Sequence, residues 1–420
     1  MKTTTIVAAL TALLATADAQ YVKPPKTTTT KTTTTTVAPA PTSFPKPYQG
    51  NPWVNAEQFI NPKFPADVRK AANKLQAAGF PNLAEKAMES AKYSTFIWLD
   101  NIASIEEKLI PSLAKAEKDR KKIFGGKKLL VPIIIYNLPE RDCSAMASAG
   151  ELFLNQDGHR KYREEYIDVI KRHIAKYPNL RFALIIEPDS LPNIATNMAV
   201  PKCAGAQDAY ISGIAYAIRA FQANNIAIYL DIGHGNWLNW GEESRLNGIA
   251  PYVNATRLAA PATYRGFASG VSNYRPLWDP TGAGRDETTF ATEMGKVAEE
   301  AGLPSKWIID TSRNGVYPPH EGYLEHGGWC NVRGAGMGPR PGLFSNSSLP
   351  NIDALVWAKT PGESDGTADR SAERFDENCV GPQAMLNAPE AGAWFQEQFV
   401  MLVRNANPPL TDSPEYSWDY

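Results

Sequence analysis

The chain has 420 residues, of which 43% are hydrophobic, 21% are charged and 10% are aromatic. This length allows one large domain or two ordinary ones, with enough apolar residues for a sizeable core. The formal net charge of −1 argues against nucleic acid or an anionic membrane surface as the partner.

The N-terminus has the pattern of a secretory signal peptide. Lys2 precedes an apolar run that starts at Ile6, and Ala17-Asp18-Ala19 resembles a cleavage site. We therefore expect residues 1–19 to be removed and the mature protein to be secreted. The run is too short to span a bilayer and no later apolar stretch reaches ~18 residues, so no membrane anchor is expected.

Residues 20–48 are rich in threonine and proline, with threonine runs at 27–30 and 32–36. Such a segment cannot bury enough apolar surface to offset the entropy of ordering it. We expect an extended, O-glycosylated stalk, followed by one catalytic barrel domain over residues 49–420.

From about Trp53 onward, strand-like and helix-like patterns alternate. Apolar runs typical of buried strands occur at 94–100, 128–138, 181–189, 226–234, 265–273, 307–312 and 354–359. Amphipathic patterns typical of helices occur near 66–90, 104–122, 158–177, 207–223, 286–301 and 390–404. The alternation predicts a parallel sheet. About seven such strands favour an α/β barrel with its site at the carboxyl ends of the strands.

Acidic residues gather where the predicted strands end. A carboxylate at the end of a buried strand is costly unless a partner or a reaction uses it, and a single one is often a helix cap or half of an ion pair. Here most of the predicted strands carry one. This convergence predicts a carboxylate-based active site, and the acids in chain order are Asp100, Asp142, Glu187, Asp189, Asp231, Asp310, Glu363 and Asp365.

Aromatic residues accompany these acids. Trp98 and Tyr136 lie at strand ends, and Trp237 and Trp240 share a loop rich in glycine and asparagine. A single loop tryptophan is usually half-buried packing, but two beside an acid cluster indicate a platform for sugar rings. Carboxylates and aromatic platforms on a secreted chain point to glycoside hydrolysis.

Asp189 suits a general acid, because an apolar strand and the carboxylate of Asp142 would both raise its pKa. Arg141, next to Asp142, either orients that carboxylate or forms a surface salt bridge.

Other classes of site find little support. No glycine-rich nucleotide-binding motif follows a predicted strand, and no cysteine or histidine spacing matches a zinc site, so no cofactor or metal is expected. Four cysteines in a secreted chain predict two disulfides in one of three pairings; they are Cys143, Cys203, Cys330 and Cys379. Asn254 and Asn346 begin glycosylation sequons.

Several segments resemble signatures of glycoside hydrolase family 6, the secreted cellulases. Residues 136–143 (YNLPERDC) and 185–191 (IIEPDSL) are similar to two of them. Further similar segments follow in consistent order between about residues 50 and 408, at 229–234, 310–315, 329–332 and 359–366. The resemblance implies a distorted barrel of about seven strands that hydrolyses β-1,4-glucan with inversion and needs no cofactor.

The resemblance also implies roles for individual residues. Asp189 matches the general acid, Asp142 the carboxyl that supports its protonation, and Tyr136 the side chain that crowds the reacting sugar. Asp365 matches the usual candidate for the base, acting through water that Ser148 helps to hold. The expected sugar-binding residues are Trp98, Asp100, Trp329, Lys359 and Glu363 on the glycone side, Trp237 and Trp240 on the leaving-group side, and His234 and Asn273. The implied disulfides are Cys143–Cys203 and Cys330–Cys379.

Two loops enclose the substrate in exo-acting members of the family. The segment from Gly366 to Pro389 is long and carries Cys379, which resembles the enclosed form. We therefore expect a monomer that releases cellobiose from the non-reducing ends of cellulose and cello-oligosaccharides. The alternatives are an endoglucanase with an open cleft, a non-catalytic sugar-binding protein on the same barrel, and a metal-dependent barrel enzyme.

The sequence departs from the family pattern in two respects. Asn137 and Glu140 stand where many fungal members carry Asp, and we expect this change to tune activity. The chain also lacks a cysteine-rich cellulose-binding module, so shorter or amorphous glucan chains are the expected preference.

Overall fold

The computed structural model describes residues 45–279, 285–321, 323 and 328–410. The predicted signal peptide and most of the predicted stalk therefore lie outside the described residues. None of the described helices combines the length and apolar content that crossing a bilayer requires.

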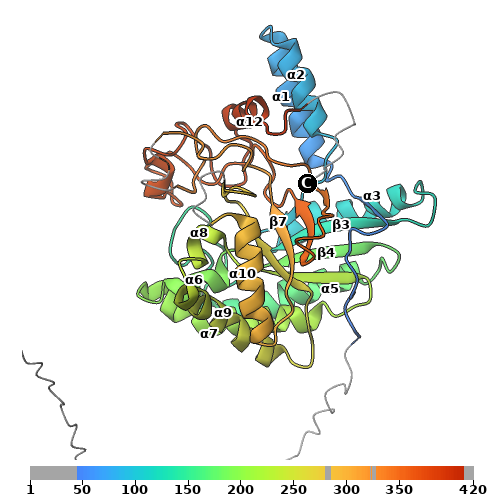
Figure 1. The fold of residues 1–420 in the computed structure, drawn as a ribbon, viewed down its shortest axis with the longest axis vertical. Coiled ribbons are helices and arrows are strands. Elements are labelled where there is room, and N and C mark those ends of the chain that lie inside the picture. The colour runs from blue at the N-terminus through green and yellow to red at the C-terminus, as the bar shows by residue number, and fades with distance from the viewer. Residues whose placement is uncertain (1–44, 280–284, 322, 324–327, 411–420) are drawn as a thin grey trace, which may run out of the picture. The chain divides into compact units, whose positions relative to one another are not determined.

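A nine-stranded sheet forms the centre of the domain (Figure 1). Every predicted strand is present, and the seven pair with one another in parallel. They are β2 (Ile97–Leu99), β3 (Lys128–Ile135), β4 (Arg181–Ile186), β5 (Ile226–Asp231), β6 (Gly266–Ser269), β7 (Lys306–Asp310) and β9 (Ile352–Val356). Two very short strands were not predicted. β1 (Ala56–Gln58) runs parallel to the start of β3, and β8 (Gly342–Leu343) runs antiparallel to β9. Strands of two or three residues are too short to show a period.

The sheet curls into a distorted barrel. Its strand order is β1-β3-β4-β5-β6-β7-β9-β8, with β2 paired to the end of β3. The β2 and β9 sides meet through a backbone hydrogen bond of 3.3 Å from the Phe96 amide to the Trp357 carbonyl, without a continuous ladder. The prediction of a distorted barrel is confirmed, with a seam in place of full closure.

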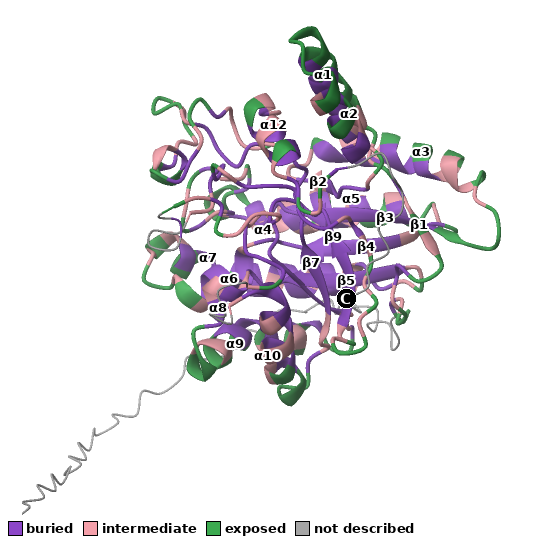
Figure 2. Ribbon diagram, turned by 45° about the horizontal axis from the view of Figure 1, so that its top comes forward, coloured by how far each residue is buried: buried purple, intermediate pink, exposed green. Residues whose placement is uncertain are grey.

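Both faces of the central strands are buried. Ile134, Ile185 and Ile308 point into the barrel, whereas their neighbours Ile133 and Leu184 pack against the surrounding helices. Figure 2 shows the strands buried and the outer faces of the helices exposed. This double burial explains why the strands read as continuous apolar runs in the sequence.

Helices cover the outside of the barrel, and the predicted ones are present with changed boundaries. They are α3 (Ile110–Arg120), α5 (Asp168–Ile174), α7 (Pro201–Ala220), α10 (Glu287–Glu300) and α12 (Gln396–Arg404). A π-helical turn, Ile105–Leu109, precedes α3, and α4 (Gly158–Lys161) and a second π-helical turn, Tyr162–Ile167, precede α5. Among the helices whose bounds the structure describes, three were not predicted: α6 (Ser190–Thr196), α8 (Gly235–Leu238) and α9 (Glu242–Ala259).

The amphipathic pattern near 66–90 is a helical hairpin, so reading it as one stretch was wrong. α1 (Lys63–Ala77) and α2 (Pro81–Ser90) are separate helices. Gly79 has a φ of 84°, which ends α1, and Pro81 occupies the first turn of α2. The hairpin packs with α12 in an apolar cluster of its own that includes Trp357.

Candidate active site

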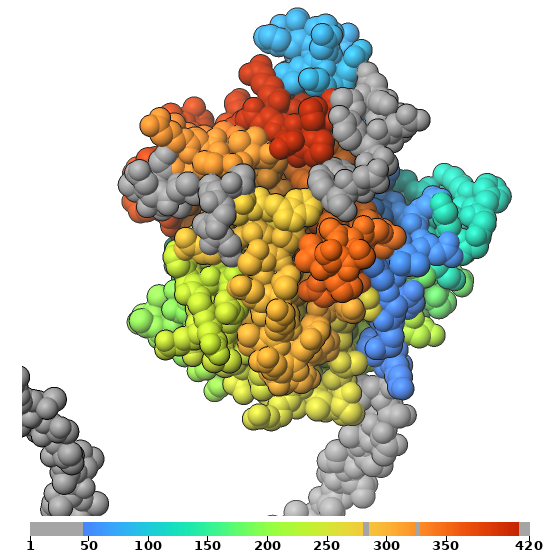
Figure 3. Space-filling view, in the orientation of Figure 1, coloured from blue at the N-terminus to red at the C-terminus, as the bar shows by residue number. Residues whose placement is uncertain are grey.

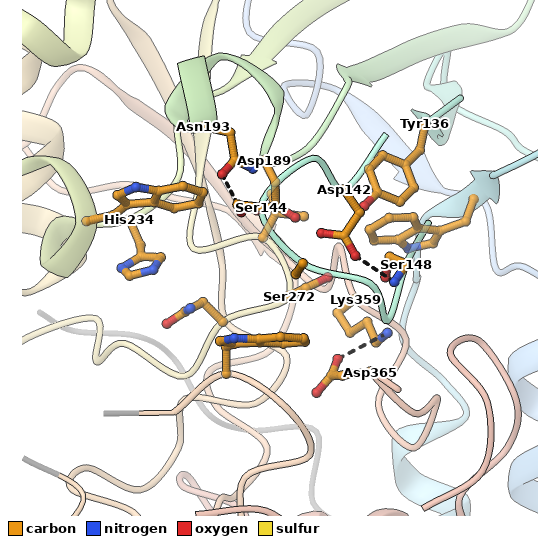
Figure 4. Close-up of a pocket in the computed structure, with 16 residues that line it drawn as sticks. Tyr136, Asp142, Ser144, Ser148, Asp189, Asn193, His234, Ser272, Lys359 and Asp365 are labelled. Carbon is orange, nitrogen blue, oxygen red and sulfur yellow. Dashed lines mark hydrogen bonds and ion pairs between the residues drawn. The ribbon is translucent and has the colours of Figure 1, made fainter. Parts of the chain in front are cut away.

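A cavity of about 300 Å³ lies at the carboxyl ends of the strands (Figure 4). Its lining contains most of the candidate residues: Trp98, Tyr136, Asp142, Ser148, Asp189, His234, Trp237, Asn273, Trp329, Lys359 and Asp365. A second cavity of about 700 Å³ shares Trp98, Tyr136, Ser148 and Lys359 with the first and is also lined by Asp100, Arg141 and Glu363. The predicted convergence of strand ends therefore produces one continuous site.

Asp189 enters the first cavity from the turn after β4. Glu187 and Asp189 have φ values of 51° and 65°, so the chain turns sharply and presents the second acid to the cavity. The Asp189 amide donates a hydrogen bond of 2.9 Å to Asp231 Oδ2. Burial, with the negative charges of Asp142 and Asp365, raises the pKa of the Asp189 carboxyl to about 7. This carboxyl therefore keeps its proton under acidic conditions and can donate it.

Asp142 occupies a similar turn after β3, with a φ of 59°. Its Oδ2 accepts a hydrogen bond of 2.7 Å from the Ser148 amide. Burial raises its pKa, although the Ser148 amide and the charge of Arg141 oppose the shift. Figure 4 shows Asp142 and Asp189 directed into the same space.

Asp365 has the opposite electrostatic environment. Burial disfavours its charge, but Arg313 and Lys359 outweigh burial and lower its pKa below the ordinary value. Arg313 Nη1 donates to both carboxylate oxygens at 2.8 and 2.7 Å, and Tyr274 donates to Oδ2 at 2.9 Å. One cavity thus holds a carboxyl that stays protonated and another that stays ionised, which is the separation that acid–base catalysis requires.

Three other strand-end acids have a structural role. Each is almost fully buried, accepts backbone N–H groups of neighbouring loops and so holds strand ends together. Glu187 accepts from Asn137 and Leu138, Asp231 from Asp189 and Gly233, and Asp310 from Ser272, Ser312, Ala358 and Lys359. The sequence alone did not separate these acids from the ones that face the cavity.

Arg141 is not part of a surface salt bridge. It is buried, its Nε donates to the Ser148 carbonyl at 2.8 Å, and its other nitrogens donate to the carbonyls of Tyr136, Asp100 and Ala149. Its guanidinium lies 4.2 Å from the centre of the Tyr136 ring. Arg141 therefore holds the Tyr136 backbone and the loop of Ser148 in place, and its charge reaches Asp142 only from a distance.

Three expected sugar-binding residues lie outside the first cavity. Glu363 and Asp100 line the second one, where they pair with Lys63 at 2.6 Å and with Lys108 at 2.5 Å. Trp240 lines neither cavity; its side chain is 61% exposed in the surface loop. Lys63 was missed because its partner lies 300 residues away in the sequence.

Two loops meet beside the cavities. In the first, residues 142–150, the Met146 amide donates to Asp376 of the second, residues 366–389, at 3.0 Å. A Cβ on Gly366 would lie 2.7 Å from the Ala147 side chain and 2.6 Å from Cys379 Sγ, so only glycine permits this contact. The disulfides Cys143–Cys203 and Cys330–Cys379, which the family resemblance implied, tie the two loops to the barrel.

Within the described residues, no group of three or more histidine, cysteine or acidic side chains is arranged to hold a metal ion. Both predicted glycosylation positions are accessible: Asn254 is exposed on α9, and Asn346 is partly exposed in the loop after β8.

Known proteins resemble this chain in sequence and in fold. The chain is 40% identical over 370 residues to Exoglucanase 3 of Agaricus bisporus, which covers 86% of this chain and 80% of that protein. The crystal structure of CcCel6C, a glycoside hydrolase family 6 enzyme from Coprinopsis cinerea, matches with a TM-score of 0.80 and 38% identity over 86% of this chain and 99% of that one. Cellobiohydrolase II (Cel6A) from Humicola insolens, in complex with glucose and cellotetraose, matches with a TM-score of 0.79 and 33% identity over 86% and 100%. The sequence model of the glycosyl hydrolases family 6 matches residues 53–406, and the chain belongs to this family.

Proposed function

We propose that this enzyme is a secreted cellobiohydrolase that cleaves the β-1,4 bonds of cellulose with inversion and releases cellobiose from non-reducing ends. The observation that carries the proposal is the cavity that holds Asp189, with its raised pKa, together with Asp365, with its lowered pKa. The related exoglucanase and cellobiohydrolases support the choice of substrate.

In this mechanism the protonated carboxyl of Asp189 donates to the glycosidic oxygen as the bond breaks. Asp142 helps Asp189 to keep that proton, because a second carboxyl nearby disfavours the charged form of Asp189. Water attacks the anomeric carbon from the opposite face, and its proton passes through further water to Asp365. Since Arg313 and Lys359 lower the pKa of Asp365, its carboxylate is ionised and available to accept the proton.

Aromatic rings on both sides of the carboxyls would hold the glucan. Trp98 and Trp329 serve the glycone side and Trp237 the leaving-group side, with Tyr136 against the reacting ring. The Trp98 and Tyr136 rings meet edge to face, at 86° and 5.4 Å between centres, so each limits the rotation of the other. Ser148 lines both cavities, which supports the proposal that it helps to hold the water through which Asp365 acts.

The exo mode rests on the joined loops. Because the Met146 amide binds Asp376 and the Cys330–Cys379 disulfide anchors the second loop, a glucan would thread beneath them more readily than it would enter from the side. Secretion, removal of residues 1–19, the stalk at 20–48 and glycosylation at Asn254 and Asn346 remain parts of this proposal that rest on sequence patterns.

The first experiment compares the wild-type enzyme with Asp189→Asn on cellohexaose. Loss of the general acid should slow hydrolysis by about two to four orders of magnitude. The wild type should release cellobiose first as the α-anomer. Asp208→Asn, at an exposed position on α7, is the matched control and should keep full activity. A β-anomeric product or an active Asp189→Asn enzyme would reject the mechanism, and sugar binding without hydrolysis would favour the non-catalytic reading.

A second experiment separates exo from endo action. The wild type should release cellobiose much faster than it lowers the viscosity of carboxymethyl-cellulose. Asp376→Ala, which removes the hydrogen bond between the two loops, should raise the viscosity-lowering rate relative to cellobiose release. If the wild type already lowers viscosity as fast as it releases cellobiose, the enzyme is an endoglucanase.

A further inference from the structure

A basic segment that the proposed function does not use joins α3 to β3. Residues 115–128 contain seven lysine or arginine residues and two acidic ones, whereas the whole chain has a net charge of −1. All six lysines in the segment are exposed. Figure 3 shows this part of the chain, coloured teal, protruding at the edge of the molecule. Many runs of charged residues only face solvent and bind nothing, so a binding role for this segment has to be argued from the features beside it.

The turn in this segment presents an aromatic ring among the lysines. Phe124 is 85% exposed. Gly125 and Gly126 have φ values of 74° and 73°, and a Cβ at either would meet nothing within 4 Å. Ile123, the residue before Phe124, packs against the main core and anchors the turn. Phe124 is therefore not needed to hold the turn in place.

Lys115, at the start of the segment, forms an ion pair with Asp119, and the remaining lysines are weakly paired. Lys122 contacts Asp119 at 3.0 Å and Lys127 contacts Glu57 at 3.6 Å, and exposed pairs of this kind contribute little and exchange readily. Lys118, Lys121 and Lys128 have no carboxylate within 4.0 Å among the residues that the structure describes. The segment therefore presents positive charge that is available to an external anion.

We propose that this segment binds an acidic polysaccharide, one whose sugar units carry carboxylates. Its ammonium groups pair with the carboxylates and the Phe124 ring packs on the apolar face of a sugar ring. A neutral glucan has no charge for the lysines to pair with, so the proposed ligand differs from the glucan of the cavities. Lys115, at one end of the segment, lines the second cavity, so an acidic polymer bound here would hold the enzyme beside neighbouring glucan. Only this last point, that binding holds the enzyme beside its glucan, rests on the proposed function.

Binding of the full chain to polygalacturonate, at about 20 mM and about 150 mM salt, tests the proposal. Fully methyl-esterified polygalacturonate is the matched probe, because it keeps the backbone and removes the charge. The wild type should bind the acidic form, more weakly at the higher salt, and should not bind the ester. Phe124→Ala should weaken binding several-fold, whereas Phe80→Ala, at another exposed phenylalanine, should not.

Two quadruple variants separate local from overall charge. Replacing Lys121, Lys122, Lys127 and Lys128 by Gln should weaken binding about tenfold or more. The control replaces four other exposed lysines by Gln, Lys86, Lys171, Lys176 and Lys296, and should leave binding unchanged. Both variants should hydrolyse cellohexaose at the wild-type rate.

Equal weakening in the two variants, or no wild-type binding at low salt, would overturn the proposal. So would tighter binding to vesicles containing anionic lipid, lost in the first variant only, because the surface would then be a membrane site. Binding to polygalacturonate without hydrolysis of cellohexaose would overturn the proposed function and leave this inference standing.

Discussion

Replacing Arg313 should destabilise the domain by a predictable amount. The side chain is fully buried, donates to both oxygens of Asp365 and lies 4.2 Å from the centre of the Tyr274 ring. Arg313→Met keeps most of the volume and removes the charge. Asp365 would then rely on Lys359, whose Nζ is 3.3 Å away, and its pKa would rise because the largest opposing charge is gone.

The magnitude follows from the cost of leaving a buried charge without its main partner, about 3–5 kcal/mol. Unfolding entropy is about 2 cal/mol/K per residue, so a domain of roughly 350 residues has about 0.7 kcal/mol/K in total. A loss of about 4 kcal/mol should therefore lower Tm by about 5–6 °C. The same loss should lower the urea midpoint without changing the slope of the transition.

The assay is urea unfolding of four proteins at one pH: wild type, Arg313→Met, Arg313→Lys, and the double variant Arg313→Met/Asp365→Asn. Arg313→Lys keeps a cation and should lose less stability than Arg313→Met. The double variant should recover part of the loss, because no unpaired carboxylate is left in the interior. An Arg313→Met protein as stable as the wild type, or a double variant less stable than the single one, would refute the electrostatic reasoning.

Three further predictions concern other buried groups. Burial raises the pKa of Glu187 from 4.5 to about 7, so between these two values the folded state binds more protons than the unfolded state. The free energy of unfolding should therefore fall as pH rises through this range, by up to about 3 kcal/mol. Urea midpoints measured at several pH values should fall less steeply for Glu187→Gln than for the wild type. Asn137 donates a hydrogen bond of 3.0 Å to Glu151, so Asn137→Asp would place two carboxylates side by side. The substitution should lower the free energy of unfolding by about 1–3 kcal/mol at pH 7 and by less at pH 4. Equal losses at the two pH values would contradict charge repulsion as the cause. Glu287 accepts a hydrogen bond of 3.0 Å from the Gly235 amide and so anchors the loop that carries Trp237. Glu287→Ala should therefore raise KM for cellohexaose more than it lowers kcat, and Glu287→Gln should restore the wild-type KM.

The strands were predictable from the sequence because burial on both sides leaves a simple signal. Ile133 faces helices and Ile134 faces the barrel interior, so an unbroken apolar run is what this environment selects. The helical hairpin was overlooked although Gly79 and Pro81 mark its turn, because an amphipathic period can continue across a break. β1 and β8 depend on their partner strands and leave no local pattern.

The sequence identified most of the cavity but not the contacts that tune it. Asp142, Asp189 and Asp365 all face the cavity as expected. Arg313, which stabilises the ionised form of Asp365, is 52 residues from Asp365 in the sequence, and Lys63 is 300 residues from its partner Glu363. Such partners are set by how the barrel closes, which no local pattern records. Trp240 stays a predicted sugar-binding residue, and its position outside both cavities depends on how its loop leaves the barrel.

The left-handed backbone at Asp142 and Asp189, with φ values of 59° and 65°, sets stability against function at the same two positions. A non-glycine residue in this region costs on the order of 1–3 kcal/mol, whereas glycine adopts it without this steric cost. Only a residue with a side chain can present a carboxyl to the cavity from such a turn. The chain therefore carries backbone strain at the two carboxyls that the proposed proton donation uses.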